Sequence, residues 1–153
     1  MDISKIIFSL LVLTTFFACD NSKKLAEYND IADVATLHGN PNSNIVIVNT
    51  QGGPVTTLMD AELKQIMQMS QTTDVLYANV HQVQTKDPSS FNSDITFDAA
   101  KTHDIESVKM LQRVVDYFKK EKNKTVYVLG ISFGAFMTQE LIATAGIDVA
   151  DKY

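Results

Sequence analysis

The sequence predicts an α/β fold with a doubly wound, mostly parallel sheet that carries helices on both faces. Apolar, β-branched runs occur at residues 44–49, 74–80 and 125–130, and segments with helical periodicity lie between and after them. Strands that alternate with helices are joined by right-handed crossovers, which make neighbouring strands parallel. The 153 residues fit one domain, since a domain typically takes about 100 to 200 residues.

The first predicted strand is NIVIVN at residues 44–49, with turn residues on both sides, GNPNS before it and TQGGP after it. A continuous β-branched run of this kind is typical of a strand buried on both faces. A short amphipathic helix is expected next, over residues 58–67, with Asp60 as a candidate N-cap. Residues 74–80 (DVLYANV) form the second predicted strand, and residues 34–37 resemble the end of an earlier one.

Residues 81–98 are polar and rich in turn formers, so a long irregular connection is expected, of the kind that is often functional or mobile. The strongest helix is predicted over residues 102–122, because it has one apolar face and lysines in its last turn. That face is formed by Ile105, Val108, Leu111, Val115 and Phe118. Residues 125–130 (TVYVLG) form the third strand and residues 133–145 the last helix, which ends at Gly146. The final residues, GIDVADKY, are interpreted as a connection into another strand.

The N-terminus has the pattern of an export signal. Lys5 precedes an apolar run at residues 6–18 (IIFSLLVLTTFFA), and the chain becomes polar at Asp20. The run is about 13 residues long, short of the roughly 20 that a membrane-spanning helix needs. Residues 1–18 are therefore interpreted as a signal peptide that is removed.

The end of this run, Ala18-Cys19, resembles the lipobox of bacterial lipoproteins, in which the cysteine is lipidated and becomes the new N-terminus. The resemblance implies a lipid on Cys19, a tether over residues 19–30, and a protein anchored to a membrane of the bacterial cell envelope. The folded domain then spans residues 31–153. The alternative is a plain secretory signal with an incidental cysteine, which gives a secreted or periplasmic protein.

Composition excludes several classes of function. The chain has 13 Lys and Arg against 18 Asp and Glu, a net charge of −5, which argues against a nucleic-acid partner. Its one cysteine, Cys19, cannot form an internal disulfide, and no Cys/His cluster has the ligand spacing of a zinc site. We therefore expect no metal.

The sequence GISFG at residues 130–134 matches the G-x-S-x-G nucleophile elbow, in which a serine sits on a strained turn between a strand and a helix. Gly130 and Gly134 remove side chains that would clash where the backbone doubles back around Ser132. The helix that follows points its N-terminal dipole toward a developing oxyanion. Here the pattern follows a predicted strand and precedes a predicted helix, as the motif requires. The alternative is a tight turn in some other doubly wound protein.

A second motif, Gln51-Gly52-Gly53-Pro54, directly follows the first predicted strand. A Gly-Gly pair lets backbone N–H groups approach a ligand closely, so this is a candidate oxyanion loop. The strand NIVIVN, the loop TQGGP, the helix containing THDIE, the strand TVYVLG and the elbow GISFG together resemble the α/β-hydrolase family. The resemblance is to its proline-iminopeptidase-like branch, whose loop reads H-G-G-P-G, and it covers residues 44–146.

The resemblance implies a sheet of α/β-hydrolase type, with Ser132 as the nucleophile and the N–H groups of Phe133 and Gly53 as oxyanion donors. It also implies a small-molecule ester, amide or peptide substrate and no cofactor, because the serine, its base and the backbone donors carry the attack. Gln51 stands where the family has histidine and Val55 where it has its final glycine, so the substrate class stays open.

The acid and the histidine of a catalytic triad are missing. In the family the triad runs Ser, then Asp or Glu, then His in chain order, and no histidine follows Ser132. Of the three that precede it, His38, His81 and His103, His81 follows the second predicted strand and is either a base or an ordinary surface-loop residue. His103 is expected to be solvated.

We expect the sequence to be the N-terminal portion of a longer exported serine hydrolase, as a fragment or a truncated reading frame. Its sheet would be incomplete at the C-terminus and the 153-residue chain inactive by itself. The alternative is a lipid-anchored binding protein that keeps a hydrolase-like fold without catalysis. A flavodoxin-like or nucleotide-binding sheet is disfavoured, because no G-x-G-x-x-G or Walker loop follows the first strand.

Overall fold

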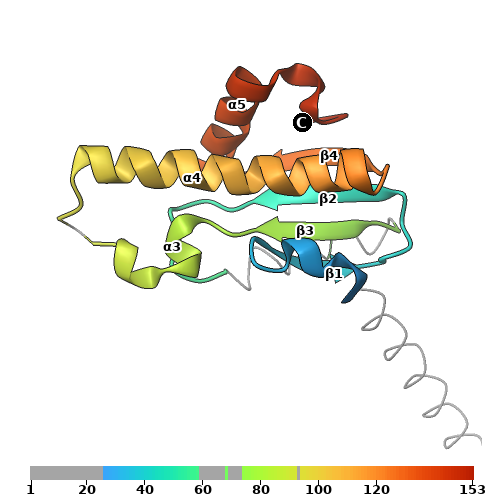
Figure 1. Cartoon of the computed structure of the whole chain (residues 1–153), viewed down its shortest axis with the longest axis horizontal. Helices are drawn as coiled ribbons and strands as arrows, with labels where there is room; N and C mark the ends of the chain where they lie inside the picture. The colour runs from blue at the N-terminus through green and yellow to red at the C-terminus, as the bar shows by residue number, and fades with distance from the viewer. Residues whose placement is uncertain (1–25, 59–67, 69–73, 93) are drawn as a thin grey trace, which may run out of the picture.

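A computed structural model describes residues 26–58, 68, 74–92 and 94–153. In this part of the chain, four strands form one open, mixed sheet in the order β1-β3-β2-β4 (Figure 1). The strands are β1 (Ala35–Gly39), β2 (Ile45–Thr50), β3 (Leu76–Val80) and β4 (Thr125–Gly130). Strand β2 is parallel to both β3 and β4, and β1 is antiparallel to β3. The predicted α/β class is therefore confirmed, with a sheet that is mostly parallel.

The three strands predicted with apolar runs are present as β2, β3 and β4, and β4 has the predicted bounds. The early segment at residues 34–37, predicted as the end of a strand, overlaps the start of β1, which begins at Ala35 and runs antiparallel to its neighbour β3. Only residues 40–44 separate β1 from β2. A parallel arrangement needs a crossover of roughly a dozen residues or more, so this short connection returns the chain in the opposite direction.

Helix α4 (Phe97–Asp116) starts five residues before the predicted bound of residue 102 and continues through one turn of π-helix, Tyr117–Glu121. It starts early because Thr96 is its N-cap, with Thr96 Oγ1 accepting a hydrogen bond from the Ala99 N–H at 3.2 Å. An N-cap of this kind satisfies a donor that the first turn leaves unpaired.

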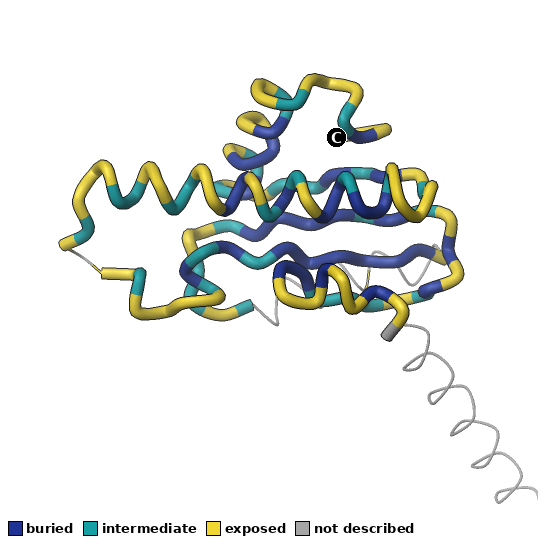
Figure 2. Tube along the Cα trace, in the orientation of Figure 1, coloured by how far each residue is buried: buried dark blue, intermediate teal, exposed yellow. Residues whose placement is uncertain are grey.

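The predicted apolar face of α4 is only partly correct. Four of its members are buried, namely Val108, Leu111, Val115 and Phe118, whereas Ile105 is 48% exposed. The N-terminal half of α4 projects beyond the carboxyl ends of the strands (Figure 1). Ile105 belongs to this projecting half of the helix, which accounts for its exposure. Figure 2 shows the same contrast, with the buried stretches of α4 confined to its C-terminal half.

Residues 81–98 are more ordered than the sequence predicts. They contain the short helix α3 (Val83–Lys86) and a 3₁₀ turn, Pro88–Ser90. The turn is capped by Asp87, whose Oδ1 accepts a hydrogen bond from the Ser89 N–H at 3.1 Å. Short-range caps of this type are hard to recognise in a stretch without apolar periodicity.

Helices α4 and α5 (Phe133–Ala145) pack on one face of the sheet. Alternate residues of β2, β3 and β4 share one core with these helices and with the 3₁₀ segment Ala26–Ile31. The opposite face carries a smaller cluster built on Val75 and Tyr77. The helix predicted over residues 58–67 lies, from residue 59 on, outside the described residues.

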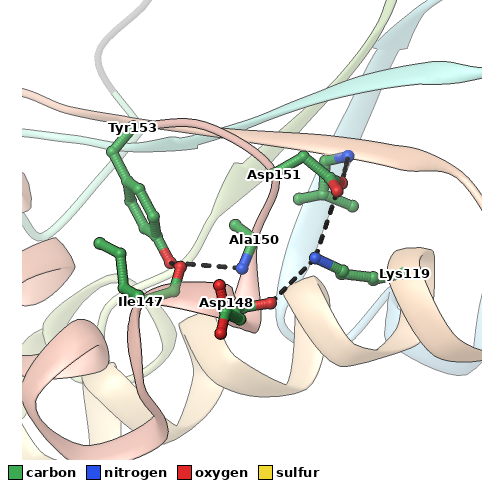
Figure 3. Close-up of polar contacts among 7 residues, drawn as sticks. Lys119, Ile147, Asp148, Ala150, Asp151 and Tyr153 are labelled. Atoms are coloured by element: carbon green, nitrogen blue, oxygen red, sulfur yellow. Dashed lines mark hydrogen bonds and ion pairs between the residues drawn. The ribbon is translucent and has the colours of Figure 1, made fainter.

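The last residues of the chain lie along the edge of β4 that faces away from β2. The Asp151 N–H donates to the Val126 carbonyl at 2.8 Å, and the Val128 N–H donates to the Lys152 carbonyl at 2.9 Å. The Asp151 carboxylate also accepts from the Val126 N–H at 2.8 Å and pairs with Lys119 at 3.3 Å (Figure 3). Lys152 forms one isolated parallel bridge with Tyr127.

The connection before this bridge is held by Tyr153. Its hydroxyl donates to the Ile147 carbonyl at 3.0 Å and accepts from the Ala150 N–H at 3.2 Å (Figure 3). Because Lys119 of the π-helical turn also donates to the Asp148 carbonyl at 2.9 Å, the connection is fixed to the helical layer as well as to the sheet.

Candidate functional site

The candidate site lies at the edge of the sheet where β2, β3 and β4 end. These three strands are parallel, so their carboxyl ends meet at one edge, where open α/β sheets bind ligands. Three connections leave that edge: residues 51–55 after β2, His81 and Gln82 after β3, and Ile131 and Ser132 after β4. The fold thus brings the glycine loop and the G-x-S-x-G motif, which are far apart in sequence, to the same place.

Ser132 has a strained backbone. Its φ of 54° and ψ of −114° place it among the few described non-glycine residues with positive φ. Such a conformation costs on the order of 1–3 kcal/mol and persists only where the surrounding structure imposes it. Here the turn is fixed by hydrogen bonds from the Gly134 N–H to the Ile131 carbonyl at 2.8 Å and from the Ala135 N–H to the Ser132 carbonyl at 2.9 Å. This is the geometry that the motif predicts.

The Ser132 side chain is available for chemistry. The residue is exposed, and its hydroxyl does not cap the helix that it precedes. A serine at an N-cap position usually accepts a hydrogen bond from the first turn of the helix. Because this serine makes no such bond, its hydroxyl is not engaged by the first turn of α5.

The two motif glycines allow close packing around the elbow. A Cβ on Gly130 would lie 2.5 Å from the Gly134 carbonyl oxygen and 2.6 Å from Thr138 Oγ1, and a Cβ on Gly134 would lie 2.6 Å from Thr50 Oγ1. Hydroxyls of Thr50 and Thr138 each donate to the Gly134 carbonyl at 2.9 Å. Both glycines are therefore required by the contact of α5 with β2 and β4.

The glycine loop at residues 51–55 lies against the elbow. A Cβ built on Gly52 would be 3.4 Å from the Ser132 Cβ and 3.6 Å from the Ile131 carbonyl oxygen. Gly53 has φ of +110°, a conformation that glycine adopts without strain. The predicted oxyanion loop and the predicted nucleophile are thus neighbours.

Gln82 holds this loop in place and was not singled out from the sequence. Its side chain is 1% exposed, and its Nε2 donates to the Gln51 carbonyl at 3.1 Å while its Oε1 accepts from the Val55 N–H at 2.9 Å. Thr85 adds a hydrogen bond from its hydroxyl to the Val55 carbonyl at 3.0 Å. The only signal in the sequence is a glutamine two residues after the end of a buried strand.

The two predicted oxyanion donors have free N–H groups. Phe133 is the first residue of α5, and the first N–H groups of a helix have no intrahelical acceptor. Among the residues that the structure describes, neither the Phe133 N–H nor the Gly53 N–H donates a hydrogen bond. Gly53 belongs to the loop that lies against Ser132, and Phe133 directly follows Ser132 in the chain. Both N–H groups are therefore available to a ligand beside the serine.

The histidines lie elsewhere. His81 Nε2 is 2.9 Å from Thr36 Oγ1 on β1, and β1 flanks β3 on the side away from β4. Burial lowers the pKa of His81 and of His38, which favours neutral rings. His103 Nδ1 lies 3.5 Å from Gln84 Nε2. Within residues 26–153, as far as they are described, no histidine forms a hydrogen bond with Ser132.

Two further findings concern metal binding and membrane spans. In the part of the chain that the structure covers, no group of three or more His, Cys, Asp and Glu side chains is placed to hold a metal ion. No described helix has both the length and the apolar character to cross a membrane. Cys19 and the rest of the predicted signal peptide and lipidation site lie outside the described residues.

Comparison with family models, with curated proteins and with solved structures finds no match to this chain. The function therefore has to be inferred from the geometry of the elbow and the loop beside it.

Proposed function

We propose that this chain carries the nucleophile and the oxyanion donors of a serine hydrolase of α/β-hydrolase type. The observation that carries the proposal is the strained, exposed Ser132, with φ of 54° at the turn between β4 and α5. Backbone strain at an exposed serine has no evident structural benefit, whereas strained residues cluster at active sites.

The proposed reaction begins with attack of Ser132 Oγ on the carbonyl carbon of an ester, amide or peptide bond. The hydroxyl proton passes to a general base, and the carbonyl oxygen becomes an oxyanion that accepts hydrogen bonds from the N–H groups of Phe133 and Gly53. The leaving alcohol or amine takes a proton as its bond to carbon breaks. Water then hydrolyses the acyl-enzyme and regenerates the serine.

The base and the acid that orients it are expected from sequence following the elbow, as in the chain order of the family that the motifs resemble. A serine without its histidine loses on the order of a millionfold in turnover. The proposal therefore expects little turnover from residues 1–153 alone. It expects no metal or organic cofactor.

The sheet order supports the resemblance to α/β-hydrolases at a finer level than the α/β class. In that family the elbow strand lies between the central strand and the next strand in sequence. Here β4, which precedes the elbow, lies between β2 and the final residues, which form a parallel bridge at Lys152. The connection after α5 thus leads to the side of β4 that the family arrangement requires.

We further propose that the protein is exported and anchored to a bacterial membrane through a lipid on Cys19. The apolar run at residues 6–18 and the Ala18-Cys19 pair support this proposal. Growth with labelled palmitate should give a labelled protein, and the label should disappear in Cys19→Ala. Persistent labelling of the variant would exclude this anchor.

The experiment that tests the hydrolase proposal is labelling of the full-length protein, purified from its own cells so that it includes the segment proposed to supply the base, by a serine-reactive fluorophosphonate. Ser132→Ala should abolish labelling, and Ser89→Ala should leave it unchanged, because Ser89 is an exposed serine in the 3₁₀ turn after α3. Labelling that is equal in Ser132→Ala would contradict the assignment. A folded protein that never reacts would favour a lipid-anchored binding protein without catalysis.

A further inference from the structure

An apolar groove of about 540 Å³ runs between α4 and α5. The buried Val108 lines it, and three further large apolar side chains that line it are exposed to solvent: Phe97 at 81%, Ile105 at 48% and Phe136 at 40%. Single exposed apolar residues are ordinary, but a cluster of them around a concavity is typical of a binding site. The volume lies within the range of small-molecule pockets.

The groove is connected to the elbow through α5. The Phe136 N–H donates to the Ser132 carbonyl at 3.3 Å, so Phe136 lies one helical turn from the serine. Its ring stacks on that of Phe133, with centroids 5.7 Å apart and an interplanar angle of 28°. The N–H of Phe133 is one of the two proposed oxyanion donors. Two stacked aromatic rings therefore link the residue that follows Ser132 to a residue that lines the groove.

A second connection runs through the glycine loop. Ala100 and Asp104 line the groove and also a smaller cavity of about 80 Å³, whose wall includes Pro54. Pro54 belongs to the loop in which a Cβ on Gly52 would lie 3.4 Å from the Ser132 Cβ. The groove is thus lined by α5, which follows the elbow, and shares two lining residues with a cavity that borders the loop after β2.

We propose that this groove binds the apolar acyl chain of a substrate whose ester or amide carbonyl lies at Ser132. This inference rests on the proposed hydrolase function and specifies its substrate class. The charged residues that line the groove balance in sign, two lysines against two carboxylates: Lys101, Lys109, Asp104 and Glu140. A lining with no net charge suits an uncharged chain better than a charged peptide.

The burial of Asp104 agrees with an apolar environment in the groove. Desolvation raises the pKa of its carboxyl above the ordinary value for aspartate. A chain that fills the groove would cover this carboxyl further and would replace water in contact with Phe97, Ile105 and Phe136. Each buried CH₂ contributes about 0.8 kcal/mol, or about a fourfold change in an equilibrium or rate constant.

The test compares an ethyl and a decyl fluorophosphonate on the natural protein. The decyl probe should label Ser132 at least about tenfold faster, since two buried CH₂ groups already supply that factor. Ile105→Gln should lower this decyl-to-ethyl rate ratio severalfold. Ile147→Gln is the matched control, because Ile147 is 59% exposed and lies outside the groove, and it should leave the ratio unchanged.

A binding measurement separates this inference from the hydrolase proposal. A fluorescent long-chain fatty acid should bind to Ser132→Ala and should bind at least about fivefold more weakly when Ile105→Gln is added. Equal labelling rates for both probes, or binding that Ile105→Gln does not weaken, would overturn the groove assignment whether or not Ser132 reacts. An Ile105→Gln effect on self-association alone, with the rate ratio unchanged, would overturn it in favour of a second copy of the chain.

Discussion

Gly52 lies directly against Ser132, with the position of a Gly52 Cβ only 3.4 Å from the serine Cβ. The two residues come from the loop after β2 and from the turn after β4, and the parallel pairing of these strands brings them together. The absence of a side chain at Gly52 leaves space beside the serine, and the proposed reaction places the substrate carbonyl in this space.

Replacing Gly52 should therefore affect reactivity more than stability. In Gly52→Ala the added methyl would meet Ser132 at ordinary van der Waals distance, so the free energy of unfolding should change by less than about 1 kcal/mol. The methyl would displace a bound carbonyl, and labelling by the ethyl fluorophosphonate should slow by about tenfold or more. Urea unfolding and labelling rates on the same sample check both parts. Unchanged labelling would mean that the substrate does not occupy this space.

The strain at Ser132 predicts a stability difference between two substitutions. Ser132→Gly removes the Cβ that disfavours φ of 54°, whereas Ser132→Ala retains it. The glycine variant should be more stable than the alanine variant by about 1 kcal/mol, because relief of strain exceeds the entropic cost of glycine in the unfolded chain. Urea midpoints measure the difference, and neither variant should react with a fluorophosphonate. An alanine variant of equal or greater stability would show that the turn is not strained.

Gln82 should be needed both for stability and for reactivity. Gln82→Leu leaves the Gln51 carbonyl and the Val55 N–H without their buried partner, and each such loss costs about 1–3 kcal/mol. The loop would also lose its position against Ser132, so labelling should slow under conditions where the variant remains folded. Gln139→Leu is the control, because Gln139 lies exposed on α5. If Gln82→Leu had the labelling rate and the stability of the natural protein, Gln82 would not be needed to hold the loop.

Two half-buried histidines predict a pH dependence of stability. Burial lowers the pKa of His38 and of His81, so the unfolded state binds protons at a higher pH than the folded state. The free energy of unfolding should be greatest above about pH 6.5 and should fall as the pH decreases through the folded pKa values. Urea unfolding at about pH 7.5 and about pH 5.5 should show a smaller loss in the His38→Gln/His81→Gln variant. The pKa of Asp104 is raised in the folded protein, so this residue increases the free energy of unfolding as the pH falls. Because it is present in the natural protein and in the double variant, it does not affect the comparison. An equal loss in both would contradict the assignment to these rings.

Sequence reasoning predicts those parts of the fold that local patterns determine. The strands β2, β3 and β4 are apolar runs bounded by turn residues, and the elbow is contained within residues 130–134. The early start of α4 was missed because only the Thr96 cap marks it. Ile105 has the periodicity of a core residue but is exposed, because periodicity along a helix does not show where the sheet that it packs on ends.

The candidate site follows the same division. Ser132 and the glycine loop can be recognised from their own neighbours in the sequence, whereas Gln82 acquires its role only because β2 and β3 are adjacent and its side chain spans the loop between them. The groove between α4 and α5 likewise depends on tertiary packing. Its exposed phenylalanines and isoleucine cannot be distinguished from core residues by periodicity alone.

The central claim is that Ser132 is a nucleophile, and locating the fluorophosphonate adduct by peptide mass spectrometry tests it most directly. The full-length protein, purified from its own cells, is labelled in mild detergent and digested, and the peptides are searched for the modified serine. We expect the adduct on Ser132, in the peptide that spans GISFG. The Ser132→Ala variant should carry no adduct on any of its remaining serines. An adduct on a different residue, or complete absence of reaction in a protein shown to be folded, would contradict it.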